Sequence, residues 1–147
     1  MKNVLPVFTL FILLLAQSAR AQKLSVQKVN NTSLTYVLNN IRSTHTAETA
    51  VISVTVYVVS NKSGSAKQPE THEVTDHIYI AVSAFDEQPK QSLFIIKNLY
   101  ASTGFLLKKQ TDQTIKLSFS YIKGEDKKNY TGIIKLDAID TGVETEE

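Results

Sequence analysis

Residues 50–60 read AVISVTVYVVS, and this stretch decides the fold class. Its even positions are all aliphatic, whereas its odd positions mix apolar with polar side chains. Side chains alternate across a pleated strand, and β-branched residues favour strands. The pattern therefore predicts a strand with one fully buried face and one half-buried face. Such a strand belongs at the centre of a sheet and needs a second layer to cover it.

Shorter alternating segments follow this strand, separated by turn residues such as glycine, proline and asparagine. We expect strands at 71–83, 92–99, 114–123 and 130–138, a short apolar segment at 105–107 and a weaker strand at 23–29. Six to eight short strands with turns between them predict an all-β fold. The expected architecture is an antiparallel β-sandwich of immunoglobulin-like or transthyretin-like type. Residues 42–49, RSTHTAET, are interpreted as a polar connector, and residues 61–70 as a loop.

Residues 33–42 fit two different elements. Leu34, Val37, Leu38 and Ile41 have the spacing of an amphipathic helix, with Thr32 or Ser33 in place to cap it. Read with a period of two, the same region forms a strand, and Thr35, Tyr36 and Val37 favour that by propensity. The sequence leaves both alternatives open.

The N-terminal residues 1–21 resemble a targeting signal rather than a folded segment. Lys2 precedes an apolar run at 4–16, and the run is followed by Ala19-Arg20-Ala21. The run is shorter than the roughly 20 residues of a membrane span, and A-x-A is typical of a signal-peptide cleavage site. We expect cleavage after Ala21 and a protein exported to the periplasm or secreted. The domain is then 22–138, with no transmembrane segment after cleavage.

Removing the signal changes the charge balance of the chain. The whole sequence has 16 Lys and Arg against 14 Asp and Glu, but Lys2 and Arg20 lie in the removed segment. The exported chain is then balanced, which removes the positive excess that nucleic-acid binding requires. We expect no nucleic-acid partner. Residues 139–147 are acidic, and we expect a disordered tail there.

The segment best supplied with side chains for metal binding or acid–base catalysis is THEVTDH, residues 71–77. On a regular strand His72 and His77 point to opposite faces, and His72 lies about 13 Å from Asp76 at roughly 3.3 Å per residue. Metal ligands must instead lie about 2 Å from one centre. A bulge, or His45 brought from elsewhere, would be needed to build a site. We therefore assign no catalytic residue, no metal ligand and no cofactor.

Other catalytic patterns are missing from the sequence. There is no cysteine, which also excludes disulfides, and there is no G-x-S-x-G elbow or glycine-rich phosphate loop. Two acidic pairs, at 86–87 and 125–126, fall on predicted turns, where neighbouring carboxylates are usually only solvated.

Lysines gather toward the C-terminal part of the chain and form a candidate interaction surface. They are Lys108, Lys109, Lys116, Lys123, Lys127, Lys128 and Lys135. Such a surface suits an anionic polysaccharide, lipid headgroups or the acidic tail. Lysines on exposed strands also protect sheet edges from aggregation. Both interpretations stay open.

The resulting prediction is a non-enzymatic exported module that binds or assembles with a protein or a cell-envelope partner. Assembly through an open sheet edge is one form of that function. The alternative is a small metal-dependent or carboxylate-based hydrolase that uses the cluster His72–His77.

Overall fold

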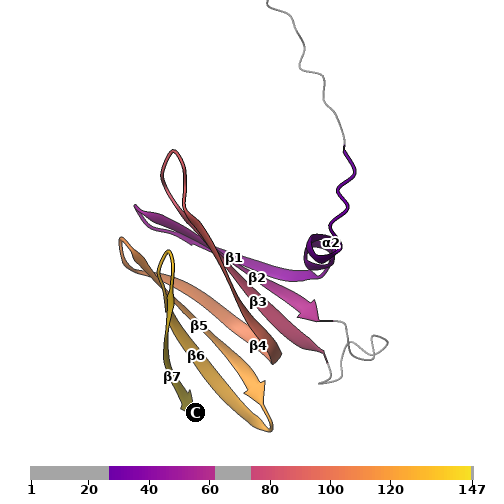
Figure 1. The fold of residues 1–147 in the computed structure, drawn as a ribbon. Coiled ribbons are helices and arrows are strands. Elements are labelled where there is room, and N and C mark those ends of the chain that lie inside the picture. The colour runs from indigo at the N-terminus through magenta and orange to yellow at the C-terminus, as the bar shows by residue number, and fades with distance from the viewer. Residues whose placement is uncertain (1–26, 62–73, 147) are drawn as a thin grey trace, which may run out of the picture. The chain divides into compact units, whose positions relative to one another are not determined.

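The computed structural model describes residues 27–61 and 74–146 (Figure 1). Residues 27–31 have no regular structure, and all the elements belong to the compact unit Thr32–Glu147. The elements are α2 (Thr32–Asn39), β1 (Ile41–Glu48), β2 (Ile52–Asn61), β3 (Thr75–Ala84), β4 (Gln91–Thr111), β5 (Thr114–Lys123), β6 (Asp126–Ile134) and β7 (Ile139–Glu146).

The strands form one antiparallel sheet in which each strand pairs with the next along the chain, in the order β1 to β7. The prediction of a mostly antiparallel β fold is therefore confirmed. The hydrogen-bonded strands belong to a single open sheet, whereas a sandwich of separate sheets was expected.

The strand β2 is paired on both sides, by β1 and β3, although it is second from the edge of the sheet and not at the expected centre. Val56 is paired with His45 on one side and with Ile80 on the other. The even positions of β2 from Ile52 to Val58 are buried, and the odd positions from Ser53 to Tyr57 are half-buried. The alternation of the sequence thus gives the inward and outward faces correctly.

The strand β4 is 21 residues long and pairs with different neighbours along its length. Its first part pairs with β3 up to Tyr100, and from Tyr100 onward it pairs with β5. Backbone irregularities mark the change: Asn98, Ala101 and Gly104 have φ of 59°, 47° and 68°. Figure 1 shows that the second part of β4 takes a different direction from the first. The sequence suggested two separate segments here, but they are one strand with a bend.

The bend brings the inward faces of the two parts of the sheet into one core. Buried residues from β2 and β3 and from β5 and β6 belong to the same hydrophobic cluster. Its members are Ile52, Val54, Val56, Val58, Ile78, Ile80, Val82, Leu99, Ile115, Leu117, Phe119, Tyr121 and Ile134. Transfer of this apolar surface out of water is the main favourable contribution to folding.

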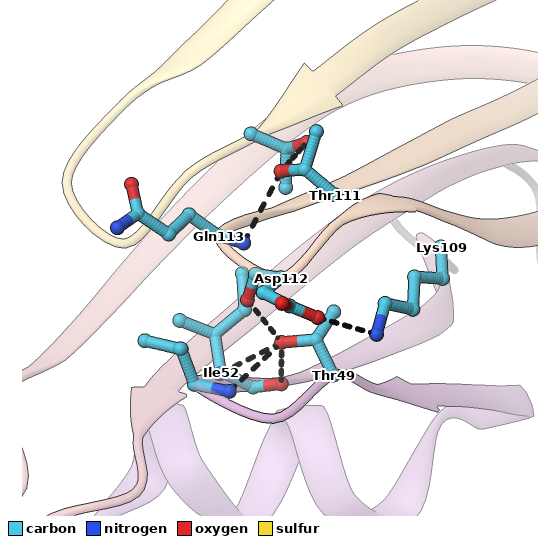
Figure 2. A network of polar contacts seen from close by, with 8 residues as sticks. Thr49, Ile52, Lys109, Thr111, Asp112 and Gln113 are labelled. Carbon is cyan, nitrogen blue, oxygen red and sulfur yellow. Dashed lines mark hydrogen bonds and ion pairs between the residues drawn. The ribbon is translucent and has the colours of Figure 1, made fainter.

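Polar contacts also join the two parts of the sheet (Figure 2). Thr49, in the turn after β1, donates a hydrogen bond from Oγ1 to the carbonyl oxygen of Asp112, in the turn after β4, over 2.6 Å. The same Oγ1 accepts hydrogen bonds from the amides of Val51 and Ile52 at 3.1 and 3.0 Å. Lys109 pairs with the Asp112 carboxylate at 2.5 Å. Two turns distant in sequence are thereby held together.

The helical alternative for the region before β1 is correct. Residues 32–39 form α2, and Ile41 begins the next strand. The Tyr36 hydroxyl donates to the Ser60 carbonyl over 3.3 Å, and the Ser60 amide donates to the Asn40 carbonyl over 2.9 Å. The helix is thus attached to the C-terminal end of β2, although none of its own residues is buried.

Two expectations about the ends of the domain were wrong. Residues 42–49 are not a connector, because 41–48 form β1, in which threonine favours the strand and one face stays polar. The expected disordered tail contains β7, which pairs with β6. Its acidic composition hid its strand character, because only Ile139 and Val143 are aliphatic in it.

Other expectations fall outside the described residues. Residues 27–29 form no strand, and the rest of the expected strand at 23–29 is not described. The expected signal at 1–21 and the expected loop at 61–70, except Asn61, also lie outside the described residues. Within 27–61 and 74–146, no helix combines the length and the apolar character needed to cross a membrane.

Candidate functional site

Asp76, the acidic residue of the predicted cluster, lies on the inward face of β3 and is 4% exposed. Its Oδ2 accepts a hydrogen bond from Arg42 Nη2 at 2.8 Å and one from Ser102 Oγ at 2.5 Å. Arg42 Nη2 also donates to the Ser102 carbonyl at 2.8 Å. A buried carboxylate needs a charged partner and hydrogen bonds to offset its lost hydration. The three residues therefore join β1, β3 and the bend of β4.

The geometry of this trio is that of a structural contact. Ser102 is 1% exposed, so its hydroxyl does not reach solvent or a substrate. Its proton is donated to Asp76, and a nucleophilic serine requires a neighbouring base that takes that proton and an open approach to the oxygen.

The histidines of the sequence prediction do not gather around Asp76. His77 lies on the outward face of β3, where its Nδ1 accepts a hydrogen bond from the Asn98 amide at 3.3 Å. His45 stacks on Phe105 with ring centroids 5.2 Å apart. His72 lies outside the described residues. Across the described ranges, no group of three or more His, Asp or Glu side chains is placed to hold a metal ion.

The acidic pairs of the turns stay at the surface. Asp86 and Glu87 are exposed, and the Asp86 carboxylate accepts a hydrogen bond from the Glu87 amide at 2.6 Å. Glu125 and Asp126 are exposed at the turn between β5 and β6.

The lysine surface separates into two groups at opposite ends of β5. Lys116 lies near the start of the strand, opposite Lys108 of β4. Lys109 and Lys135 are at the same end, and each pairs with an aspartate at 2.5 Å. The other group is Lys123, Lys127 and Lys128, at the turn between β5 and β6. Lys128 is buried and lies 3.5 Å from the Asp126 carboxylate.

A different feature stands out in the first part of β4. Residues 91–99 pair with β3 on one side, but none of the seven strands pairs with them on the other side, because β5 begins to pair only at Tyr100. We call residues 91–99 the open edge of β4. A strand edge of this kind presents unpaired backbone donors and acceptors to another strand.

Residues 93–96 of the open edge are apolar on both faces. On the outward face Leu93 is 66% exposed and Ile95 is 41% exposed. On the inward face Phe94 and Ile96 are only partly buried against the core. Leu93 also borders a groove of about 400 Å³ on the outward side of β2, β3 and β4. Half-covered hydrophobic side chains on an edge strand are typical of a surface that another chain covers.

The two terminal strands of the sheet lack this character. Along β1, charged residues stand at both ends, Arg42 and Glu48, and the register shifts between Ile41 and Ser43. β7 begins with Ile139 and Asp140, and Asp140 pairs with Lys135. Charges and bulges are the usual means by which proteins protect edges. Within the open edge, Lys97 and the register shift against β3 come after Ile96. Residues 91–96, QSLFII, have no charge, no proline and no bulge against β3.

Sequence reasoning missed Arg42, Ser102 and the open edge. A signal for the first two existed, because Asp76 shares the inward face with Ile78 and Ile80, and a carboxylate in such a position requires a cation. The open edge also left a signal, since SLFII is apolar on both alternating faces. Whether another strand pairs beside this segment depends on the tertiary fold, and the alternation of side chains carries no information about that.

The chain was compared with models of protein families, with characterised proteins and with solved structures, and none of the three comparisons finds a match.

Proposed function

We propose that this protein is an exported, non-enzymatic module that binds a protein partner by strand addition at the open edge of β4. The observation that carries the proposal is the free side of the open edge, where residues 91–96 have no charge and Leu93 and Ile95 are exposed. In strand addition, the backbone hydrogen bonds supply affinity and alternate side chains supply specificity. The open edge offers both.

The lysine groups provide weaker support for a partner. They lie at opposite ends of β5, and Lys109, Lys128 and Lys135 are engaged in ion pairs with aspartates. An ammonium group that is already paired with an aspartate attracts an anionic partner less strongly. For this reason the proposal assigns the partner to the open edge.

The fold proposal is a sandwich-like arrangement of the two parts of the sheet, on either side of the bend in β4. It is supported by the core cluster, which combines side chains of β2 and β3 with those of β5 and β6. The strand order gives no support to an immunoglobulin-like or transthyretin-like type, because the connections follow the chain order throughout.

Site-specific photocrosslinking tests the binding proposal. A photoreactive amino acid replaces Leu93 in the full-length precursor, which is expressed in cells that export it, and the cells are irradiated. The matched control replaces Leu106, which is 59% exposed on the second part of β4. That part is also hydrogen-bonded on one side only, to β5, but it contains Lys108 and Lys109, and its Phe105 stacks on His45 of β1. We expect adducts from position 93 and few from position 106. Equal yields at both positions, or none at position 93, would contradict the proposal.

Export itself rests on residues 1–21, and intact-mass measurement of the exported protein tests it. We expect a chain that begins at Gln22, because cleavage follows the A-x-A arrangement. A mass that still includes residues 1–21 would contradict the proposed location without affecting the open edge.

A further inference from the structure

We infer that the partner at the open edge is a second copy of this chain, paired antiparallel through residues 91–97 with Phe94 opposite Phe94. This inference rests on the proposed function and names its partner. The two copies would be related by a two-fold axis at Phe94, so that the same edge serves both chains, as in most symmetric dimers.

The register follows from the chemistry of the residues that would face each other. With Phe94 opposite itself, Leu93 lies opposite Ile95 on the outward face, and directly opposed apolar side chains stabilise a strand pair. On the inward face the two phenylalanines meet, and Ser92 lies opposite Ile96. Lys97 lies opposite Gln91, so no like charges are opposed.

Neighbouring registers are less favourable. A shift that places Leu93 opposite itself also places Ile95 opposite Gln91 and moves Lys97 out of the strand pair. A shift that places Ile95 opposite itself places Leu93 opposite Lys97. On the outward face, each shift thus replaces an apolar contact with apolar–polar ones. The second shift gains contacts between Phe94 and Ile96 on the inward face, so it is disfavoured by the lysine that it places opposite Leu93.

Self-pairing is favoured over another partner by the composition of the edge. An edge with positive charge alone would favour an acidic strand, but between Gln91 and Ile96 there is no charge to complement. What residues 91–96 require is an uncharged strand with apolar side chains on both faces, and the same residues of a second copy are such a strand. The dimer would also continue the outward apolar row from Leu93 and Ile95 into the same residues of the second copy.

Sedimentation equilibrium of the purified exported protein provides the first test. We expect a dimer that dissociates on dilution. Leu93→Lys should weaken dimerisation at least tenfold, because a lysine would face Ile95 of the other copy twice in each dimer. Leu106→Lys is the matched control and should leave the dimer constant unchanged, since it introduces the same charge at a similarly exposed position of the same strand. Circular dichroism and thermal melting of both variants establish that each is folded.

The absence of cysteine from the chain allows a direct test of register. Leu93→Cys and Ile95→Cys are prepared as separate proteins and oxidised singly and mixed. In the inferred register the mixture forms a covalent heterodimer, and neither protein alone forms a comparable homodimer. Covalent Leu93→Cys homodimer, or covalent Ile95→Cys homodimer, would instead reveal one of the two shifted registers and overturn the inferred one.

A second mixture, Ser92→Cys with Ile96→Cys, is needed because not every pair of opposed cysteines is close enough to form a disulfide. Directly opposed residues alternate between close and wide pairs along an antiparallel ladder, and the close pairs are better suited to cross-linking. One of the two mixtures therefore has the close geometry in the inferred register. If neither mixture is cross-linked more than its components, the inferred register is wrong.

The results separate this inference from the proposed function. A monomer at all concentrations, together with photocrosslinked adducts of other masses from position 93, would overturn self-pairing and leave strand addition in place. A monomer without adducts at position 93 would overturn both. A dimer that Leu93→Lys and Leu106→Lys weaken equally would show that the copies associate through a different surface.

Discussion

Ser102 donates a hydrogen bond to a carboxylate that the fold has removed from water. Ser102→Ala removes one of the two groups that donate to Asp76 Oδ2 and leaves Arg42 to stabilise the charge alone. A buried charged group that loses a hydrogen-bond partner costs about 1 to 3 kcal/mol. We expect the free energy of unfolding, measured by urea denaturation, to fall by that amount.

The control for this substitution is Ser118→Ala, on the outward face of β5. Surface substitutions usually change stability by less than about 0.5 kcal/mol, so this variant should unfold like the wild type. If both serine variants have equal stability, the Asp76 contact does not stabilise the fold.

Gly132 is required by the ring of Tyr130, two residues before it on the same inward face. A Cβ at Gly132 would lie 2.7 Å from the Tyr130 hydroxyl oxygen, closer than real Cβ contacts. The ring is not free to move, because it stacks on Phe119 with centroids 4.8 Å apart. Gly132→Ala should therefore lower the free energy of unfolding by about 1 to 3 kcal/mol, the usual cost of overpacking.

A double-mutant cycle with Tyr130→Phe distinguishes this clash from other effects of alanine. The phenylalanine lacks the hydroxyl that makes the shortest contact, so Gly132→Ala should cost less in that background. An equal cost in both backgrounds would mean that the hydroxyl is not the obstacle.

Burial raises the pKa of Tyr130 above its ordinary value of 10.0. The folded state therefore holds the phenol proton to a higher pH than the unfolded state does. Below pH 10 both states are protonated and the contribution is complete, whereas above pH 10 the unfolded state loses the proton first and stability falls. Urea denaturation from pH 9 upward should show a steeper loss for the wild type than for Tyr130→Phe. Parallel curves would contradict the prediction.

At the scale of the element, β2 supports the sheet through its inward face. Val56 is fully buried, with β1 and β3 paired on either side. An unpaired carboxylate at this position costs several kcal/mol, comparable with a total stability of about 5 to 15 kcal/mol. Val56→Asp should therefore prevent folding, as measured by circular dichroism and solubility. The neighbour Thr55 points outward, so Thr55→Asp should fold; failure of both would show that acid is not tolerated on either face.

The elements that the sequence predicted are those with a regular pattern of burial. The alternation of β2, β3 and β5 is visible because one face of each is fully buried. The edge strand β1 has no apolar stripe, so its threonines were read as a connector. The helical spacing at 34, 37, 38 and 41 competed with a strand period, and attachment of α2 to the end of β2 is a tertiary contact.

The same distinction explains what was missed about the site. Asp76 was identified from its neighbourhood in sequence, but Arg42 and Ser102 reach it from two other strands. The bend of β4 depends on positive φ at Asn98 and Ala101. A glycine would have indicated such a conformation in the sequence, and neither of these residue types indicates it as strongly. Without the bend, residues 91–99 would be expected to pair on both sides, and the open edge would not exist.

For the whole molecule, the question is how the two parts of the sheet stay together when only β4 connects them by hydrogen-bonded pairing. The core cluster provides a non-directional attraction. Directional contacts are found at both ends of β1: Arg42 with Asp76 and Ser102, and Thr49 with Asp112. A row of stacked rings, from His45 through Phe105 to Phe119, lies between them. These contacts connect β1 with the second part of the sheet, so the two parts should unfold together.

Thr49→Val tests the connection at the C-terminal end of β1, where the Thr49 side chain makes the contact with Asp112. Valine keeps the shape of threonine but cannot donate to the Asp112 carbonyl or accept from the Ile52 amide. With each of these two hydrogen bonds worth about 0.5 to 1.5 kcal/mol, the free energy of unfolding should fall by about 1 to 3 kcal/mol. Hydrogen exchange should accelerate at both turns, 49–51 and 112–113, because the contact that closes one also closes the other. Thr46→Val, on the exposed face of β1, makes the same chemical change away from the contact and should alter neither measurement. Faster exchange confined to 49–51 would mean that Thr49 organises only its own turn, and that the core alone holds the two parts of the sheet together.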